Sequence, residues 1–390
     1  MKAELLAPAG DFKSLKAAVS SGADAVYIGA AKFSARQNAK NFDSDELTEA
    51  IRYCKVRNVK TYLAINTLIK DSELTEALKT AAEAYEAGID AYIVQDLGLI
   101  KLLRKKFDVP VHASTQMTVF DEYGLKFLKK LGIERAVLSR ECPKEKIKSL
   151  AEKSIMELEV FCHGAICLSY SGQCLLSSII GGRSANRGRC AQPCRLPYSV
   201  DGKKGYFLSP KDLCLIDETA FLNEIGISSL KIEGRMKTAL YVATVARTYR
   251  KAIDDYLEDP KLYEEHMPWY RTQIASCTYR QFTTGFFYGR PDENTQIYDN
   301  NTYVKEYTYL GIVGEVDAEG YCRIEQRNKF SVGEQIEIMK PDGQNVEVTV
   351  KRILNEDGEE QESAPHSKQI LHVELEGGRA EAYDILRRKE

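Results

Sequence analysis

Short apolar runs alternate with amphipathic stretches over roughly the first 260 residues of the chain. Residues 5–10 predict a buried strand, and Asp11 is placed to cap a helix that extends to residue 21. The same unit recurs. Further strands are predicted at 25–29, 60–66, 91–96, 110–116, 135–141, 156–164 and 229–235, and further helices at 44–57, 72–87, 97–106, 122–131, 144–153 and 238–256.

Alternating strands and helices favour a parallel sheet. Eight units within about 250 residues match the usual size of a (β/α)8 TIM-like barrel. An open doubly wound sheet is the alternative, but the glycine fingerprint of a dinucleotide site is absent after the first strand. We therefore expect an α/β fold whose first domain, residues 1–258, is such a barrel.

The alternation stops after residue 164, where Gly, Ser, Arg and Cys dominate up to residue 208. Insertions of this length are usually functional or disordered. We expect a cysteine-rich insertion at 162–208 and a connecting segment at 259–302. Apolar and alternating runs separated by turns then predict a small C-terminal β-barrel domain at 303–390, with strands at 309–316, 321–326, 335–339, 345–353 and 369–373.

Composition adds few constraints. The 390 residues are 44% hydrophobic and 28% charged, which is ordinary for a soluble globular protein. No apolar run is long enough to span a bilayer and no signal-peptide pattern is present, so we expect a cytoplasmic protein without a membrane partner. The net charge of −3 neither supports nor excludes nucleic acid, so an RNA partner would need a local basic patch.

Four cysteines carry the strongest chemical signal. Cys167, Cys174, Cys190 and Cys194 form the pattern C-x6-C-x15-C-x3-C. In a reducing compartment such clustering indicates metal ligation rather than disulfides. Zinc sites favour C-x2-C hairpins, whereas iron–sulfur clusters accept more varied spacing, so a cluster is preferred and zinc stays the alternative. The other cysteines that we expect to be structural are Cys54, Cys142, Cys277 and Cys322.

Polar residues collect where the predicted strands end, which is where barrel enzymes hold their active sites. Any single polar residue at a strand end can be explained by the solvated loop that follows, but the set as a whole predicts a functional site. The set comprises Asn66, Gln95, Asp96, Ser114 to Gln116, Arg140, Glu141, His163, Glu233 and Arg235.

The segment from Glu159 to Ser177, EVFCHGAICLSYSGQCLLS, resembles the signature of the peptidase U32, or collagenase-like protease, family. Further segments resemble the same family over nearly the whole chain: LAPAG at 6–10, DAVYIG at 24–29, AINT at 64–67, KIEGR at 231–235, QRNKF at 326–330 and YDILR at 383–387.

The resemblance implies more than the family's name. Related members are oxygen-independent hydroxylases with a [4Fe-4S] cluster, acting on tRNA wobble uridine, an rRNA cytidine or ubiquinone precursors. Prephenate is implicated as oxygen donor for the RNA enzymes. A barrel followed by a short β domain is most similar to the tRNA uridine 5-hydroxylase branch, since the rRNA branch carries a longer C-terminal extension. One cluster cysteine sits elsewhere in the ubiquinone branch, so Cys194 is the least certain ligand.

Residue roles follow as expectations. Arginine bonds carboxylates bidentately, so Arg140 and Arg235, with Arg36 behind them, are candidates to hold prephenate; ion pairs with Glu141 or Glu233 are the alternative. His163 is a candidate proton carrier or a structural histidine. The expected catalytic set is His163, Arg140, Arg235 and Glu233, and the expected substrate or RNA contacts are Arg36, Asn66, Gln116, Arg183, Arg187, Arg189 and Arg195.

Other functions stay open at this point. A peptidase is one, although Cys162 and His163 are adjacent on a predicted strand, whose side chains alternate between faces, and no H-E-x-x-H or G-x-S-x-G motif is present. An rRNA cytidine hydroxylase and an iron–sulfur protein that works only with a partner are the others. The sequence does not indicate an oligomeric state.

Overall fold

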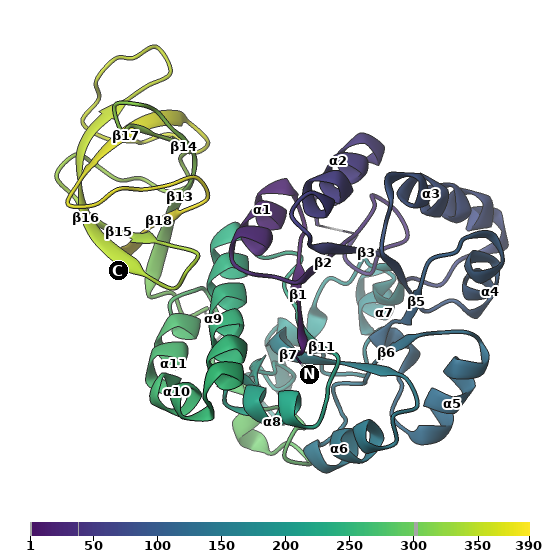
Figure 1. The fold of residues 1–390 in the computed structure, drawn as a ribbon. Helices are drawn as coiled ribbons and strands as arrows, with labels where there is room; N and C mark the ends of the chain where they lie inside the picture. Colours follow the sequence, from purple (N-terminus) through teal and green to yellow (C-terminus); the bar gives the residue numbers. More distant parts are fainter. Residues whose placement is uncertain (1, 38, 300–302) are drawn as a thin grey trace.

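A computed structural model of the chain describes residues 2–37, 39–299 and 303–390 (Figure 1). In these residues eight parallel strands close into a barrel, because β11 pairs with both β7 and β1. The TIM-like barrel predicted from the sequence is thereby confirmed and the open sheet is excluded. The strands are β1 Glu4–Pro8, β2 Ala25–Ile28, β3 Lys60–Ile65, β4 Ala91–Val94, β5 Val111–Ala113, β6 Arg135–Val137, β7 Glu157–Ala165 and β11 Ser229–Ile232.

Helices surround the barrel (Figure 1). Aspartates begin several of them: the Asp11 carboxylate accepts a hydrogen bond from the Ser14 backbone N–H at 2.8 Å, and Asp96 and Asp121 cap in the same way. The predicted helices are confirmed within a few residues of their ends. They are α1 Phe12–Ser20, α2 Ser44–Lys55, α3 Leu74–Ala87, α4 Leu97–Lys106, α5 Glu122–Lys130, α6 Lys144–Glu152 and α9 Ala239–Glu258, with a short α8, Thr219–Glu224, before the last strand.

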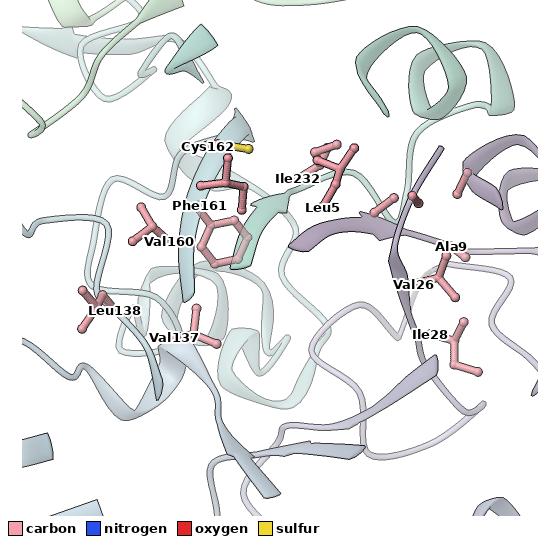
Figure 2. Packing of buried hydrophobic residues seen from close by; sticks show 14 of the residues in the cluster. Leu5, Ala9, Val26, Ile28, Val137, Leu138, Val160, Phe161, Cys162 and Ile232 are labelled. Atoms are coloured by element: carbon pink, nitrogen blue, oxygen red, sulfur yellow. The ribbon is translucent and has the colours of Figure 1, made fainter. Parts of the chain in front are cut away.

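The apolar core lies between the strands and these helices. Figure 2 shows part of it, with Leu5, Val26, Val137, Val160 and Ile232 contributed by separate barrel strands. Removing this surface from water supplies most of the stabilisation of the fold.

The inside of the barrel is charged. Lys231 Nζ donates to Glu159 Oε1 at 2.6 Å, and the Arg135 guanidinium bonds Glu4 and Glu157 at the opposite end from the strands' carboxyl ends. These buried charges are thus paired with one another, which offsets the cost of removing them from water.

The cysteine-rich insertion adds structure that the sequence did not predict. β10, Asp212–Cys214, pairs antiparallel with the end of β7, and β12, Phe282–Thr283, pairs with β10. A short helix, α7 Leu176–Gly181, lies between Cys174 and Cys190, and a hairpin of β8 Tyr198–Val200 and β9 Lys203–Gly205 lies between Cys194 and β10.

Within residues 303–390, six antiparallel strands form a second, closed barrel with its own apolar core. The five predicted strands are confirmed as β13 Tyr307–Val316, β14 Cys322–Glu325, β15 Gln335–Met339, β16 Asn345–Leu354 and β17 Ile370–Glu376, and the barrel closes through an unpredicted sixth, β18 Ile385–Lys389. Helices α10 Pro260–Glu265 and α11 Met267–Ala275 precede it. The domain limit expected at residue 302 lies outside the described residues.

The small barrel lies beside α9 (Figure 1). Leu240 and Ala243 of α9 pack against Met339 and Ile385 of the small barrel. No helix in the described part of the chain combines the length and the apolar character needed to cross a membrane.

Candidate active site

A pocket opens at the carboxyl ends of the barrel strands, and eight of the predicted site residues line it, Ser114 and Thr115 among them. Arg36 follows β2, Asn66 follows β3, Gln116 follows β5 and Arg140 follows β6, while Glu233 and Arg235 follow β11. The closed barrel brings these distant segments together. The pocket holds only about 40 Å³, room for a few water molecules, because the arginines and Ser171 of the cysteine-rich insertion fill its entrance.

Glu233 is the centre of an arginine cluster. Its Oε2 lies 3.1 Å from Arg36 Nη2 and 3.3 Å from Arg140 Nη2. Burial alone would raise the pKa of Glu233, but the arginines outweigh it and hold the pKa below its ordinary value. Arg140 also stacks on the Phe161 ring, with its guanidinium carbon 3.6 Å from the ring centroid. Arg140 therefore forms the ion pair with Glu233 that the sequence left as an alternative, and both side chains line the pocket.

Arg235 is not fully satisfied by this cluster. Its Nη2 donates to Ser34 Oγ, whereas Nη1 is buried without a partner in the described residues. Burial lowers the pKa of Arg235 to about 10, which still leaves it charged at neutral pH. A buried donor without an acceptor is costly. Arg235 thus lines the pocket, while its unpaired Nη1 lies against Gly29.

Lys231 belongs to the site although the sequence argument did not select it. Its ammonium lines the pocket floor, 4.6 Å from the Tyr27 ring centroid, and bonds Glu159 below. Burial lowers the pKa of Lys231, and Glu159 opposes that effect. The signal was present: residues 231, 233 and 235 alternate, and alternate strand residues share a face. Of the described side chains that line the pocket, four are cationic and one is a carboxylate.

Amides complete the rim. Gln95 Nε2 donates to the Asn66 carbonyl at 2.8 Å and to Gln116 Oε1 at 3.1 Å. Asn66 Oδ1 accepts from the Ala35 backbone N–H at 2.9 Å, which fixes the loop that carries Arg36. Asn66 and Gln116 therefore hold neighbouring groups in place and also line the pocket.

The four cysteines lie near one another and near this pocket. Burial raises the pKa of the Cys167 thiol, while Arg140 and Arg36 lower it, so the thiol faces the arginine cluster. Burial also raises the pKa of Cys194; Arg195 lowers it, and Cys167, Cys190 and Cys174 raise it further. All four are free thiols.

An iron–sulfur cluster on these four thiols stays a prediction. Thiolates are the donors that such a cluster needs. Among the described residues, no group of three or more Cys, His, Asp or Glu side chains is placed to hold one metal ion.

His163 does not reach the pocket. β7 contains a bulge at Cys162, which lies between the pairs Lys231–Phe161 and Ile232–His163. Phe161 lines the pocket, but the buried His163 ring contacts Tyr241, Tyr249 and Phe282, with ring centroids 5.4–6.0 Å apart. Burial lowers the pKa of His163 to about 3, and neither ring nitrogen has a partner in the described chain. This environment favours the structural histidine over the proton carrier.

Cys162 offers no support for a thiol protease. It is fully buried, its Sγ lies 3.4 Å from the Lys231 carbonyl, and burial raises the pKa of its thiol well above the ordinary value. A nucleophilic cysteine needs the opposite shift.

The four loop arginines do not form one basic patch. Arg195 is buried and donates to the carbonyls of Ile166, at 3.1 Å, and Pro210, so it braces the cysteine-rich insertion. Arg187 bonds the Leu68 carbonyl at 2.7 Å and Glu73. Arg189 is exposed and Arg183 is half-buried.

Comparison with known proteins identifies the family of the chain. A model described as peptidase family U32 matches residues 10–297, and one described as its C-terminal domain matches residues 305–387. The chain is 37% identical over 393 residues to a tRNA hydroxylation protein of Bacillus subtilis, covering 96% of this chain and 92% of that protein.

Two other relatives carry different names. A 23S rRNA 5-hydroxycytidine synthase of Escherichia coli is 39% identical over 269 residues, which cover 66% of this chain and 40% of that protein. A protein named collagenase from Porphyromonas gingivalis is 32% identical over 330 residues, or 79% of each chain. The resemblance seen in the signature segment is confirmed, and the chain belongs to peptidase family U32.

Proposed function

We propose that the protein is an iron–sulfur-dependent hydroxylase of RNA. More narrowly, it forms 5-hydroxyuridine at the wobble position of tRNA without molecular oxygen, with prephenate as the oxygen donor. The observation that carries the proposal is the arginine-lined pocket beside Cys167. The named activities of the tRNA and rRNA relatives support an RNA substrate.

The pocket's charge suits a dicarboxylate. Arg36 and Arg140 pair with Glu233, and Arg235 lines the same pocket, so three guanidinium groups face one carboxylate and a dicarboxylate would balance the remaining charge. Lys231 would hold a proton at Nζ on the floor, next to the bound ligand.

Cys167, Cys174, Cys190 and Cys194 would hold the cluster. When bound, it supplies electron transfer or an open iron position beside the pocket. The residues of the chain bind and orient the carboxylate donor, and the loop that carries Ser171 excludes water from above.

A base can enter only if this loop moves, because the cavity is too small for a ring. Gly172 lies against Gln116, and a Cβ on Gly172 would stand 2.8 Å from Gln116 Nε2. The loop is therefore a close cover over the mouth, and a flipped-out nucleotide would displace it.

The test of function is nucleoside analysis of tRNA and 23S rRNA from a deletion strain complemented with variants. We expect Arg140→Ala to lose at least about 99% of tRNA hydroxylation. The substitution removes both the guanidinium group that would bind the carboxylate donor and its stacking on Phe161. The exposed Arg52 of α2 provides the control, and Arg52→Ala should restore wild-type levels. Unchanged tRNA in the deletion strain would reject the tRNA proposal, and loss of hydroxycytidine from 23S rRNA would reassign the substrate.

The cluster is tested separately by anaerobic purification, visible absorption, and iron and sulfide analysis. We expect brown protein with about four irons per chain, and bleaching in Cys167→Ala. Cys322, buried in the small barrel, is the control, and Cys322→Ala should keep its colour. Colourless wild-type protein, or protein with bound zinc, would contradict the cluster.

A further inference from the structure

The β8–β9 hairpin, residues 198–205, pairs with neither barrel. Its two strands bond only each other, and none of its side chains joins an apolar core cluster of the described chain. Asp201 and Gly202 form the turn, and both have the positive φ, 50° and 74°, that a tight two-residue hairpin turn requires. The hairpin therefore adds little to the stability of the fold, and its own turn sets its shape.

Two contacts hold the hairpin beside the cysteine segment. At its first strand, the Tyr198 hydroxyl donates to the Pro193 carbonyl at 2.8 Å, next to Cys194. Just after its second strand, the Tyr206 N–H donates to the Tyr298 carbonyl at 3.0 Å. A two-stranded hairpin is only marginally stable in water by itself. These contacts at its base therefore fix its position next to Cys194.

The hairpin presents lysines without acidic partners. Lys203 and Lys204 are exposed, and neither forms an ion pair within the described residues. Lys203 is opposite Val200 and Lys204 is opposite Ser199, so one lysine lies on each face of the hairpin. Lysine on an exposed strand also hinders pairing with a strand of another protein. The hairpin is thus better suited to an anionic partner than to a third strand.

The segment around the hairpin is basic. Residues 183–211 contain seven lysines and arginines and one aspartate, although the whole chain has a net charge of −3. Arg187 is paired with Glu73, and Arg195 donates to backbone carbonyls. The other five cations of the segment have no carboxylate partner in the described chain: Arg183, Arg189, Lys203, Lys204 and Lys211. This segment is therefore the basic part of a weakly acidic protein.

The small barrel has the opposite charge. Residues 303–390 contain 12 lysines and arginines and 19 aspartates and glutamates. Phosphate groups are repelled by such a surface, whereas unpaired lysines attract them and release their counterions. A nucleic-acid backbone is therefore expected to lie on the cysteine-rich insertion and not on the small barrel.

Balancing the charge of a cluster does not account for the hairpin lysines. Arg195, buried next to Cys194, already lowers the pKa of that thiol. Exposed lysines serve this purpose poorly, because salt screens charges in water over about 10 Å. Their exposure favours a partner that comes from solution.

We propose that the β8–β9 hairpin binds the phosphate backbone of the RNA substrate, with Lys203 and Lys204 contacting one phosphate each. The inference rests on the proposed function, because it assigns a contact to the same substrate. A backbone contact adds affinity for any RNA sequence and positions the strand, and it leaves recognition of the base to the pocket.

The experiment measures binding of the full-length protein, prepared without oxygen, to a fluorescent tRNA transcript with uridine at the wobble position. Lys203→Gln combined with Lys204→Gln should bind about tenfold more weakly at about 0.1 M salt. The plot of log K against log salt should also become shallower by about 1.5, since each phosphate contact contributes roughly 0.7–0.9 to its slope. Lys203→Arg combined with Lys204→Arg keeps both charges and should bind like wild type.

The matched control removes the same charge from the small barrel. Lys329 and Lys368 are exposed, and neither forms an ion pair within the described residues. Lys329→Gln combined with Lys368→Gln should leave both the affinity and the salt slope at the wild-type values. Equal losses in the two double variants would show that only the net charge matters, and would overturn the inference.

The remaining outcomes separate this inference from the proposed function. Wild-type protein that binds no tRNA would overturn both. Tight tRNA binding that is unchanged in the hairpin variant would overturn the hairpin contact and leave the hydroxylase proposal intact. Binding to vesicles of anionic phospholipid that is lost in the hairpin variant, with tRNA binding unaffected, would assign the lysines to a membrane surface and overturn the RNA contact.

Discussion

At the scale of single residues, hydrogen-bond partners decide how a buried polar side chain is used. Arg235 and Arg195 are both buried, yet Arg235 keeps a donor without a partner in the described residues, and Arg195 donates to two backbone carbonyls. His163 is equally buried, but aromatic rings surround it and its ring nitrogens meet no polar partner among the described residues. Residue type alone does not distinguish these roles.

We predict that His163→Phe changes the pH dependence of stability. The pKa of His163 is about 3 in the folded protein and ordinarily near 6.5. Below pH 6.5 the unfolded chain therefore binds a proton that the folded chain does not, and stability falls with falling pH. Between pH 8 and pH 5 the free energy of unfolding should drop by ~2 kcal/mol more in wild type than in the variant, as measured by urea unfolding.

The same variant should keep RNA hydroxylation near the wild-type level, since the ring lies outside the pocket. A parallel pH response of wild type and variant would show that His163 is hydrated or paired. Lost activity in a variant that folds normally would restore the proton-carrier role.

At the scale of elements, the cysteine-rich insertion depends on a few anchors. Arg195 ties residues next to Cys194 to Ile166, the neighbour of Cys167, so one side chain links two cysteine-bearing segments. The antiparallel pairing of β10 with β7 holds the far end of the insertion on the barrel. The thiols are thus positioned mainly by backbone anchors.

We expect Arg195→Ala to weaken the cluster without unfolding the barrel. Its loss leaves the Ile166 and Pro210 carbonyls unpaired, at a cost of about 1–3 kcal/mol confined to the insertion. Visible absorption should bleach several-fold faster in air, while far-UV circular dichroism stays unchanged. Arg189 in the same loop is exposed, and Arg189→Ala is the matched control. Equal bleaching in both variants would show that the cluster is weakened by the loss of a positive charge, and not by the loss of the Arg195 hydrogen bonds.

At the scale of the whole molecule, α9 joins the two barrels. The buried Arg247 of α9 donates to the Lys340 carbonyl at 2.8 Å and to Asn345 Oδ1 at 2.8 Å in the small barrel. Arg387 of β18 reaches back to Ser276 Oγ at 2.7 Å. Together with the apolar contacts of Leu240, these bonds fix the small barrel against the side of the large one.

Arg247→Met should loosen this junction. The substitution keeps side-chain bulk but leaves buried carbonyls unpaired, so we expect a loss of about 2 kcal/mol and faster release of a C-terminal fragment in limited proteolysis. Each barrel has its own core and should persist. The exposed Arg379 of the small barrel is the control, and Arg379→Met should be cleaved like wild type. If Arg247→Met resists proteolysis as well as wild type does, the apolar contacts of α9 hold the junction without the Arg247 hydrogen bonds.

The sequence by itself determined the eight barrel strands and seven of the helices between and after them, five of the six strands of the small barrel and the four clustered cysteines. These features depend on local periodicity and spacing, which the chain carries in order. It also identified Arg36, Arg140, Glu233 and Arg235 as site residues, because the carboxyl ends of all strands in a parallel barrel lie on the same face of the barrel.

The tertiary structure decided the rest. Only the closed barrel shows that the arginines meet at Glu233 and that Lys231 forms the floor. The bulge at Cys162 displaced His163, because one extra residue changes which side chains share a face, and no local pattern marked it. The pocket is lined by residues that range from Tyr27 to Arg235, a proximity that strand pairing and packing create and that sequence order does not contain.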